Sequence, residues 1–258
     1  MPWILVVILA IVQGLTEFLP VSSSGHLAFL TFLWKQDPSL IFTILLHVGT
    51  LCAVVWVYRN EIYRLISGVL LRQRESLVYT GYIIVTSMVT VIIALIGKKF
   101  FEESYSNIPL IAVCWLVTAV LLFLTDRLKY SEKPLSLKIA LVVGLFQGIA
   151  ILPGISRSGL TIIAALIMGM ERKKAAQYAF LVSIPVILGS AILELKDVVN
   201  TGDCTVSLPQ IAVGMIIAAI TGYAAIRLFI KTVLNGRLVW FSIYLFLLAT
   251  AAIVHYIH

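Results

Sequence analysis

Residues 3–34 of the chain read WILVVILAIVQGLTEFLPVSSSGHLAFLTFLW. Both ends of this run are apolar, but the segment Pro20–His26 interrupts it with a proline, three serines, a glycine and a histidine. The arm after the break holds roughly 9 to 12 residues, and at about 1.5 Å per helical residue it is too short to cross a bilayer core of about 30 Å. The run therefore predicts a re-entrant helical hairpin, which enters a membrane and returns to the same side.

The rest of the sequence also has the composition of a membrane protein. Of its 258 residues, 61% are apolar and 12% are charged, against about 25% charged in a typical soluble domain. Such a chain has too few polar residues to cover a water-soluble surface. Six stretches are long and apolar enough to span a bilayer, at roughly 40–58, 77–97, 108–125, 175–195, 209–230 and 238–257. We predict an all-α polytopic membrane protein with six transmembrane helices.

A second broken apolar region resembles the first. It runs from about residue 136 to 170 and is interrupted by Pro153–Gly159. Gln13-Gly14 matches Gln147-Gly148, and Ser24-Gly25 matches Ser158-Gly159, each at an offset of 134 residues. The first three spans, moved by the same offset, fall on the last three. The sequence thus predicts one membrane domain, 1–258, built from two repeats at about 1–130 and 135–258.

The two repeats are predicted to have opposite orientations. A hairpin returns to its starting side, so three further spans leave the second repeat beginning on the other side of the membrane. Inverted repeats of this kind bring broken helices together near the midplane of the bilayer.

The basic residues predict which side faces the cytoplasm. Fourteen lysines and arginines fall on one side of the predicted topology and four on the other. By the positive-inside rule the crowded side is cytoplasmic, so both termini and the opening of the first hairpin face outward. The net charge of +7 is explained by these loops, which attract anionic lipid headgroups. We therefore expect no nucleic-acid partner.

Both breaks carry polar side chains at membrane depth. Irregular backbone at that depth is tolerated where it is buried in protein or lines a wet cavity, and the polar residues favour a cavity. Gln13 and Glu17 are four residues apart, on one helix face. The candidate residues are Gln13, Thr16, Glu17, Ser22, Ser23, Ser24 and His26 in the first hairpin, and Gln147, Gly154, Ser156, Arg157, Ser158 and Thr161 in the second.

These residue types suit the binding and transfer of a phosphate. Arg157 is the one cation in the apolar segments away from a loop. At the centre of a membrane helix an arginine costs about 2.5–3.5 kcal/mol, and its guanidinium fork matches phosphate oxygens. The turn around Gly154 exposes backbone N–H groups to an anion. A serine can attack phosphorus, and Glu17 and His26 supply a base, a metal ligand or an acid.

Structural explanations of the same residues stay open. The serines can satisfy backbone groups at helix kinks. Glu17 and Arg157 can form an ion pair that only joins the hairpins, and His26 can be an interfacial histidine. His47, in a span without a motif around it, is expected to be a packed, hydrogen-bonded histidine and not a ligand.

Two long motifs carry a family resemblance. QGLTEFLPVSSSGH at 13–26 resembles the first signature of the bacterial undecaprenyl-diphosphate phosphatases, the bacitracin-resistance family, and PGISRSGLT at 153–161 resembles the second. The resemblance covers the chain in length, span order and repeat placement. It implies an enzyme of the bacterial inner membrane that removes the terminal phosphate of undecaprenyl diphosphate and so recycles the lipid carrier of cell-wall synthesis.

The resemblance also implies roles for individual residues. The nucleophile would be Ser23, Glu17 its base or a metal ligand, and Arg157 the phosphate clamp, with His26 as acid, base or alternative nucleophile. It further implies a divalent cation, Mg²⁺ or Ca²⁺, near Glu17 and Gln13. Because Gln13 stands where many relatives have glutamate, a site with two carboxylates is in doubt. The expected substrate contacts are Gln13, Ser22, Ser24, Gly154, Ser156, Ser158 and Thr161.

A lipid-phosphate flippase or transporter is the alternative function, because inverted repeats with broken helices also build transporters. The set of Ser23, Glu17 and His26 favours an enzyme, since transport does not require it. The sequence leaves open the attacking group (Ser23, His26 or water), the preferred metal, the lipid chain length and the assembly, a homodimer included.

Overall fold

The structure, a computed structural model, describes residues 1–35, 40–127, 132–201 and 206–257, and within these it contains eleven α-helices and no strand. The basic residue Lys129 and the predicted repeat boundary at about 130 lie outside the described residues. The helices are α1 (Trp3–Phe18), α2 (Ser23–Trp34), α3 (Leu40–Val57), α4 (Arg59–Leu70), α5 (Arg74–Ser104), α6 (Ile108–Thr125), α7 (Leu137–Ile149), α8 (Arg157–Ile167), α9 (Arg172–Thr201), α10 (Leu208–Leu234) and α11 (Val239–Ile257).

All six predicted spans are helices: α3, α5, α6, α9, α10 and α11. Five of them are long and apolar enough on their own to cross a membrane, and α3 passes that test together with α4. Their outer faces expose large apolar side chains, among them Ile96, Ile220 and Phe246, and lipid is the solvent that such faces require. The prediction of an all-α polytopic membrane protein is confirmed.

The prediction missed α4 and shortened two spans. α4 follows α3 after a bend of 76°. Its sequence alternates apolar residues with Arg59, Glu61 and Arg64, so its mean hydropathy is too low for a search that looks for continuous apolar runs. α4 packs closely on α5, where a Cβ at Gly68 would lie 2.0 Å from Ser76 Oγ. α5 and α9 extend beyond the predicted 77–97 and 175–195 because their ends are polar yet helical.

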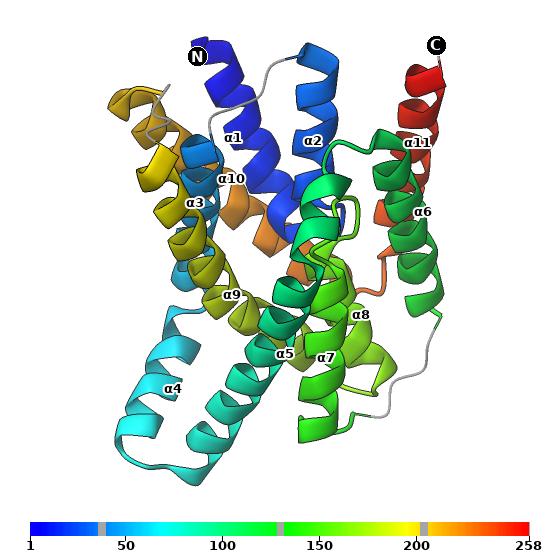
Figure 1. Cartoon of the computed structure of the whole chain (residues 1–258). Helices are drawn as coiled ribbons and strands as arrows, with labels where there is room; N and C mark the ends of the chain where they lie inside the picture. The colour runs from blue at the N-terminus through cyan, green and yellow to red at the C-terminus, as the bar shows by residue number, and fades with distance from the viewer. Residues whose placement is uncertain (36–39, 128–131, 202–205, 258) are drawn as a thin grey trace.

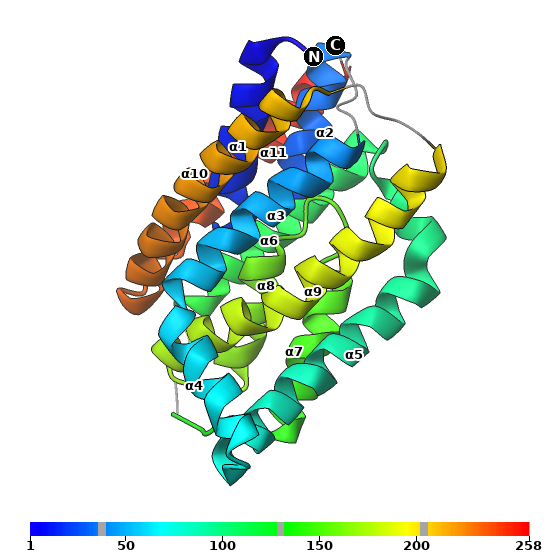
Figure 2. The same ribbon diagram turned by 90° about the vertical axis from the view of Figure 1, so that its left-hand side faces the viewer.

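The two predicted helical hairpins are α1–α2 and α7–α8. Figure 1 shows α1 entering from the end of the molecule that holds both termini, and α7 entering from the opposite end. Each hairpin packs on a long helix from the other half of the chain, α1 on α10 and α7 on α5. Figure 2 shows α10, α3, α9 and α5 side by side on one face of the bundle.

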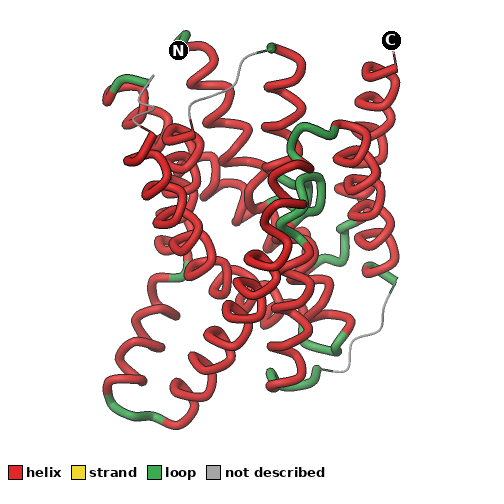
Figure 3. Tube along the Cα trace, viewed as in Figure 1, coloured by secondary structure: helices red, strands yellow, loops and turns green. Residues whose placement is uncertain are grey.

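The tips of both hairpins lie in the interior. Figure 3 shows the non-helical segment between α7 and α8 surrounded by helices in the middle of the molecule. Close helix crossings hold the hairpins there. A Cβ at Gly14 of α1, for example, would lie 1.9 Å from Thr221 Oγ1 of α10. The fold therefore carries the polar breaks into the centre of the bundle.

Candidate active site

The second arm of each hairpin begins with the same capping device. Ser22 caps α2 by accepting a hydrogen bond from the Gly25 N–H (3.3 Å), and Ser156 caps α8 by accepting one from the Gly159 N–H (3.1 Å). Each cap hydroxyl also lies 3.2 Å from the hydroxyl of the serine two residues later. Serine is a preferred N-cap because its oxygen satisfies a free N–H of the first helical turn. The spacing between serine and glycine that the two motifs share has this local explanation.

Polar contacts also join one tip to the other. Ser22 Oγ accepts a hydrogen bond from the Gly154 N–H (3.0 Å), and Ser158 Oγ donates one to the Leu19 carbonyl (3.1 Å). The tips approach closely, because a Cβ at Gly25 would lie 2.9 Å from the Gly154 nitrogen. Ser22, Gly154, Ser156 and Ser158 thus have protein partners here, and their assignment as substrate contacts stays a prediction.

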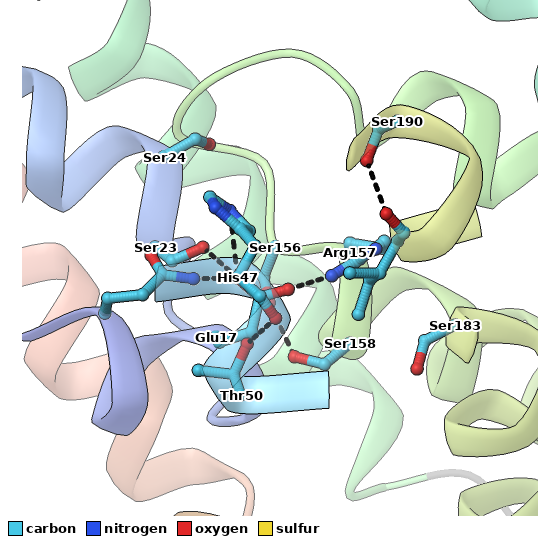
Figure 4. Close-up of polar contacts among 12 residues, drawn as sticks. Glu17, Ser23, Ser24, His47, Thr50, Ser156, Arg157, Ser158, Ser183 and Ser190 are labelled. Carbon is cyan, nitrogen blue, oxygen red and sulfur yellow. Dashed lines mark hydrogen bonds and ion pairs between the residues drawn. The ribbon is translucent and has the colours of Figure 1, made fainter. Parts of the chain in front are cut away.

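The charged centre of the site combines residues from both hairpins. Glu17, at the end of α1, is buried, and Arg157, the first residue of α8, forms an ion pair with its Oε1. On the other carboxylate oxygen, Ser23 Oγ donates a hydrogen bond of 2.6 Å and Gln13 Nε2 one of 2.9 Å. Figure 4 shows Ser23 and Arg157 converging on Glu17. The sequence predicted this meeting of Glu17, Ser23 and Arg157, and the structure brings them together.

Exposure separates the structural serines from the groups that a substrate can reach. The caps Ser22 and Ser156 are buried, whereas Ser23 and Arg157, each one residue further along, are half-buried. Beyond the ion pair lies a cavity of about 10 Å³ that Thr161 and Ser183 help to line. That is room for about one water, so a phosphate has to approach Ser23 and Arg157 from their exposed sides.

His47 is a site residue that the sequence analysis did not assign. It lies on α3, and its Nε2 is 3.6 Å from Glu17 Oε2 (Figure 4). Its Nδ1 is 2.9 Å from the Thr43 carbonyl, so it is the hydrogen-bonded histidine that was expected. Its place beside the site was missed because α3 carries no motif. The one available signal was an ionisable residue within a span, which is by default a functional candidate.

His26 faces a different part of the molecule. Its ring nitrogens lie 2.7 Å from the Ser22 carbonyl and 2.7 Å from the Tyr244 hydroxyl of α11. None of the contacts found for the described residues joins His26 to Glu17, Ser23 or Arg157. Its role as an acid, base or nucleophile stays a prediction.

Comparison with known proteins places the chain in a family. A family model described as "Bacitracin resistance protein BacA" matches residues 6–251. The chain belongs to this family. The curated protein named undecaprenyl-diphosphatase from Treponema denticola is 41% identical over 252 residues, covering 93% of this chain and 92% of that protein. Proteins of the same name from Alkaliphilus metalliredigens and Methanococcus vannielii are 40% and 36% identical, over 92% and 97% of this chain and 93% and 99% of theirs.

Proposed function

We propose that this protein hydrolyses undecaprenyl diphosphate to undecaprenyl phosphate and inorganic phosphate in the membrane. The observation that carries this proposal is the hydrogen bond from the half-buried Ser23 hydroxyl to Glu17, with the Arg157 guanidinium on the other oxygen of the same carboxylate. The proposed nucleophile, Ser23, and the proposed phosphate-binding cation, Arg157, therefore both contact the proposed base, Glu17. The flippase alternative leaves the Ser23–Glu17 pair without a role.

The geometry supports a two-step reaction. Ser23 Oγ attacks the terminal phosphorus and passes its proton to Glu17, while the bond from that phosphorus to the bridging oxygen breaks and undecaprenyl phosphate leaves. Glu17 loses that proton to solvent and then takes a proton from a water that attacks the phosphorus of the phosphoserine. The bond from phosphorus to Ser23 Oγ breaks, Glu17 returns the proton to Ser23 Oγ, and inorganic phosphate leaves. Arg157 exchanges part of its ion pair for phosphate oxygens and stabilises the negative charge in both steps.

A divalent cation, Mg²⁺ or Ca²⁺, is part of the proposal. Glu17 supplies one carboxylate, and beside it the buried Oε1 of Gln13 has no hydrogen-bond partner within the described part of the chain. The described part of the chain contains no group of three or more His, Cys, Asp or Glu side chains that could hold a metal ion. This donor set fits a cation shared with the substrate, as is usual for Mg²⁺, and Glu17 and Gln13 would hold it. When bound, it would neutralise charge on the phosphate oxygens.

The proposed location is the bacterial cytoplasmic (inner) membrane, with the site open to the outer (periplasmic) face. Both termini lie at the same end of the molecule (Figure 1), and the distribution of basic residues assigns that end to the outside. The first hairpin enters from there. A diphosphate headgroup would reach Ser23 from the outer leaflet while the prenyl tail stays in lipid, and the product would return to the carrier pool of cell-wall synthesis.

The test is phosphate release from undecaprenyl diphosphate by purified protein, with and without a chelator. We expect release that the chelator abolishes and that Ser23→Ala lowers by at least about 10²-fold. Ser87→Ala is the matched control, because this half-buried serine lies on α5 and donates a hydrogen bond to the Ile83 carbonyl of its own helix (2.8 Å), so it should change the rate by no more than a few-fold. A Ser23→Ala protein with the wild-type rate would exclude Ser23 as the attacking group.

A further inference from the structure

His26 is held by hydrogen bonds on both sides of its ring. Nδ1 lies 2.7 Å from the Ser22 carbonyl oxygen, which can only accept. In the neutral ring one nitrogen donates and the other accepts, so Nδ1 carries the proton and Nε2 accepts. The Tyr244 hydroxyl, 2.7 Å from Nε2, is then the donor. The contacts form one directed chain, from Tyr244 through His26 to the backbone of Ser22.

Aromatic packing fixes the ring in this position. The Tyr244 ring is nearly parallel to that of His26, with an interplanar angle of 4° and centroids 5.7 Å apart. The fully buried Trp115 meets the imidazole at 65°, with centroids 5.5 Å apart. His26 itself is 8% exposed. These neighbours leave the imidazole little freedom to turn towards a substrate.

The chain ends on a strained residue. Ser22 has φ +67° and ψ +97°, a conformation that residues other than glycine seldom adopt. Such a conformation persists only where the surroundings hold it. The Ser22 side chain is held by the N–H groups of Gly25 and Gly154, and its carbonyl by His26. The next residue is Ser23, whose hydroxyl points at Glu17.

We propose that Tyr244 and His26 are positioning residues, which hold the strained Ser22 turn and thereby aim the Ser23 hydroxyl at Glu17 and the phosphate. Tyr244 reaches His26 from α11, the last helix of the chain, and so couples the second half of the molecule to the first hairpin. This role rests on the proposed function for its effect on rate, but its effect on the Ser22 turn is independent of hydrolysis.

The kinetic experiment compares Tyr244→Phe, His26→Asn and the double variant, using phosphate release from undecaprenyl diphosphate. Tyr244→Phe should lower kcat by about tenfold, with KM within about twofold, since one net hydrogen bond is lost. In His26→Asn the amide can still donate to the Ser22 carbonyl, but the asparagine side chain is too short to reach Tyr244. We therefore expect a similar loss of kcat in this variant. The double variant should be no slower than His26→Asn alone, because both residues act through one chain.

The matched control is Tyr256→Phe. Tyr256 lies on the same helix as Tyr244 and packs against Phe32 of α2 through its ring. The Tyr256→Phe variant should therefore release phosphate at the wild-type rate. If His26→Asn abolishes activity, by more than about 10³-fold, while Tyr244→Phe stays within twofold, His26 acts on the substrate itself and the proposal is wrong. If Tyr244→Phe does not fold, His26→Asn decides alone. A loss of about tenfold supports the positioning role, and a loss of more than about 10³-fold overturns it.

A second readout keeps this inference separate from the proposed function. Hydrogen exchange of the peptide covering Ser22–His26 reports the Gly25 and His26 amides, which are bonded to Ser22. Exchange should be faster in Tyr244→Phe and unchanged in Tyr256→Phe. Equal exchange in the wild type and Tyr244→Phe would overturn the inference. An inactive wild-type protein with faster exchange in Tyr244→Phe would overturn the proposed function alone.

Discussion

The two hairpins share a frame and differ in their chemistry. At positions 134 residues apart, the cap serines Ser22 and Ser156 make the same hydrogen bond to a glycine N–H. The next pair differs: Ser23 is the first residue of α2, and Arg157 is the first residue of α8. The predicted nucleophile and the predicted phosphate clamp therefore occupy equivalent places in two similar hairpins.

The comparison shows how two similar hairpins can form one site. Positions that agree between the hairpins satisfy backbone groups at the tips. Positions that differ supply the ionisable groups: Glu17 has Ile151 as its counterpart, and His26 has Leu160. Because the hairpins enter from opposite ends (Figure 1), each presents its distinct residue to the other, and neither holds a complete site alone.

The largest effect is expected at the residue that distinguishes the second hairpin. Arg157→Ala should lower kcat/KM for the prenyl diphosphate by about 10³-fold, since it removes the phosphate-binding cation. Arg157→Lys should recover part of this loss, because lysine keeps the charge but not the planar fork. Phosphate release from folded, purified protein measures both.

Arg172→Lys is the control for Arg157. Arg172 also lies near a carboxylate, 3.6 Å from Asp126, but at the beginning of α9 and away from the tips. Its substitution should leave the rate within about twofold. A folded Arg157→Ala protein with nearly wild-type turnover would show that the second hairpin does not contribute to the chemistry.

A smaller effect, on stability, should separate the two tip glycines. A Cβ at Gly25 would lie 2.9 Å from both the Gly154 nitrogen and Trp115 Nε1, whereas a Cβ at Gly159 would lie 3.1 Å from its nearest atoms, Pro20 Cβ and Ser156 Oγ. Gly25→Ala should lower the free energy of unfolding by about 1–3 kcal/mol through overpacking. Gly159→Ala should be close to neutral, because alanine also favours the helix. Denaturation in detergent measures both, and equal losses would contradict the tip contact.

The smallest expected effect concerns the paired glutamines. Gln13→Glu places a second carboxylate beside Glu17, so the cation concentration for half-maximal activity should fall, by about tenfold, as ligand charge increases. Gln147, the counterpart, donates to Thr90 Oγ1 instead (2.9 Å), and Gln147→Glu should leave the cation dependence unchanged. Titration of activity with Mg²⁺ measures this. An unchanged requirement in Gln13→Glu would remove Gln13 from the cation site.

The features that the sequence predicted are those with a local signal. Span length and hydropathy located six helices, and the breaks located both hairpins. The meeting of Glu17 with Arg157 followed from the argument for inverted repeats. The side of the membrane and the catalytic roles stay predictions.

The features that the sequence missed depend on packing between distant segments. His47 reaches Glu17 only because α3 lies beside the first hairpin, and His26 meets Tyr244 across 218 residues of chain. The partner of the Ser22 hydroxyl, Gly154, lies in the other hairpin. α4 was missed for another reason, because its apolar residues are interspersed with charges.

The central claim is that Glu17 of the first hairpin and Arg157 of the second form one ion pair, and a double-mutant cycle tests it most directly. The free energy of unfolding in detergent is measured for the wild type, Glu17→Gln, Arg157→Gln and the double variant. Direct contact predicts a coupling energy of about 1–3 kcal/mol, because either single change leaves the other charge unpaired in a largely buried site. Single losses that add to within about 0.5 kcal/mol would contradict the claim.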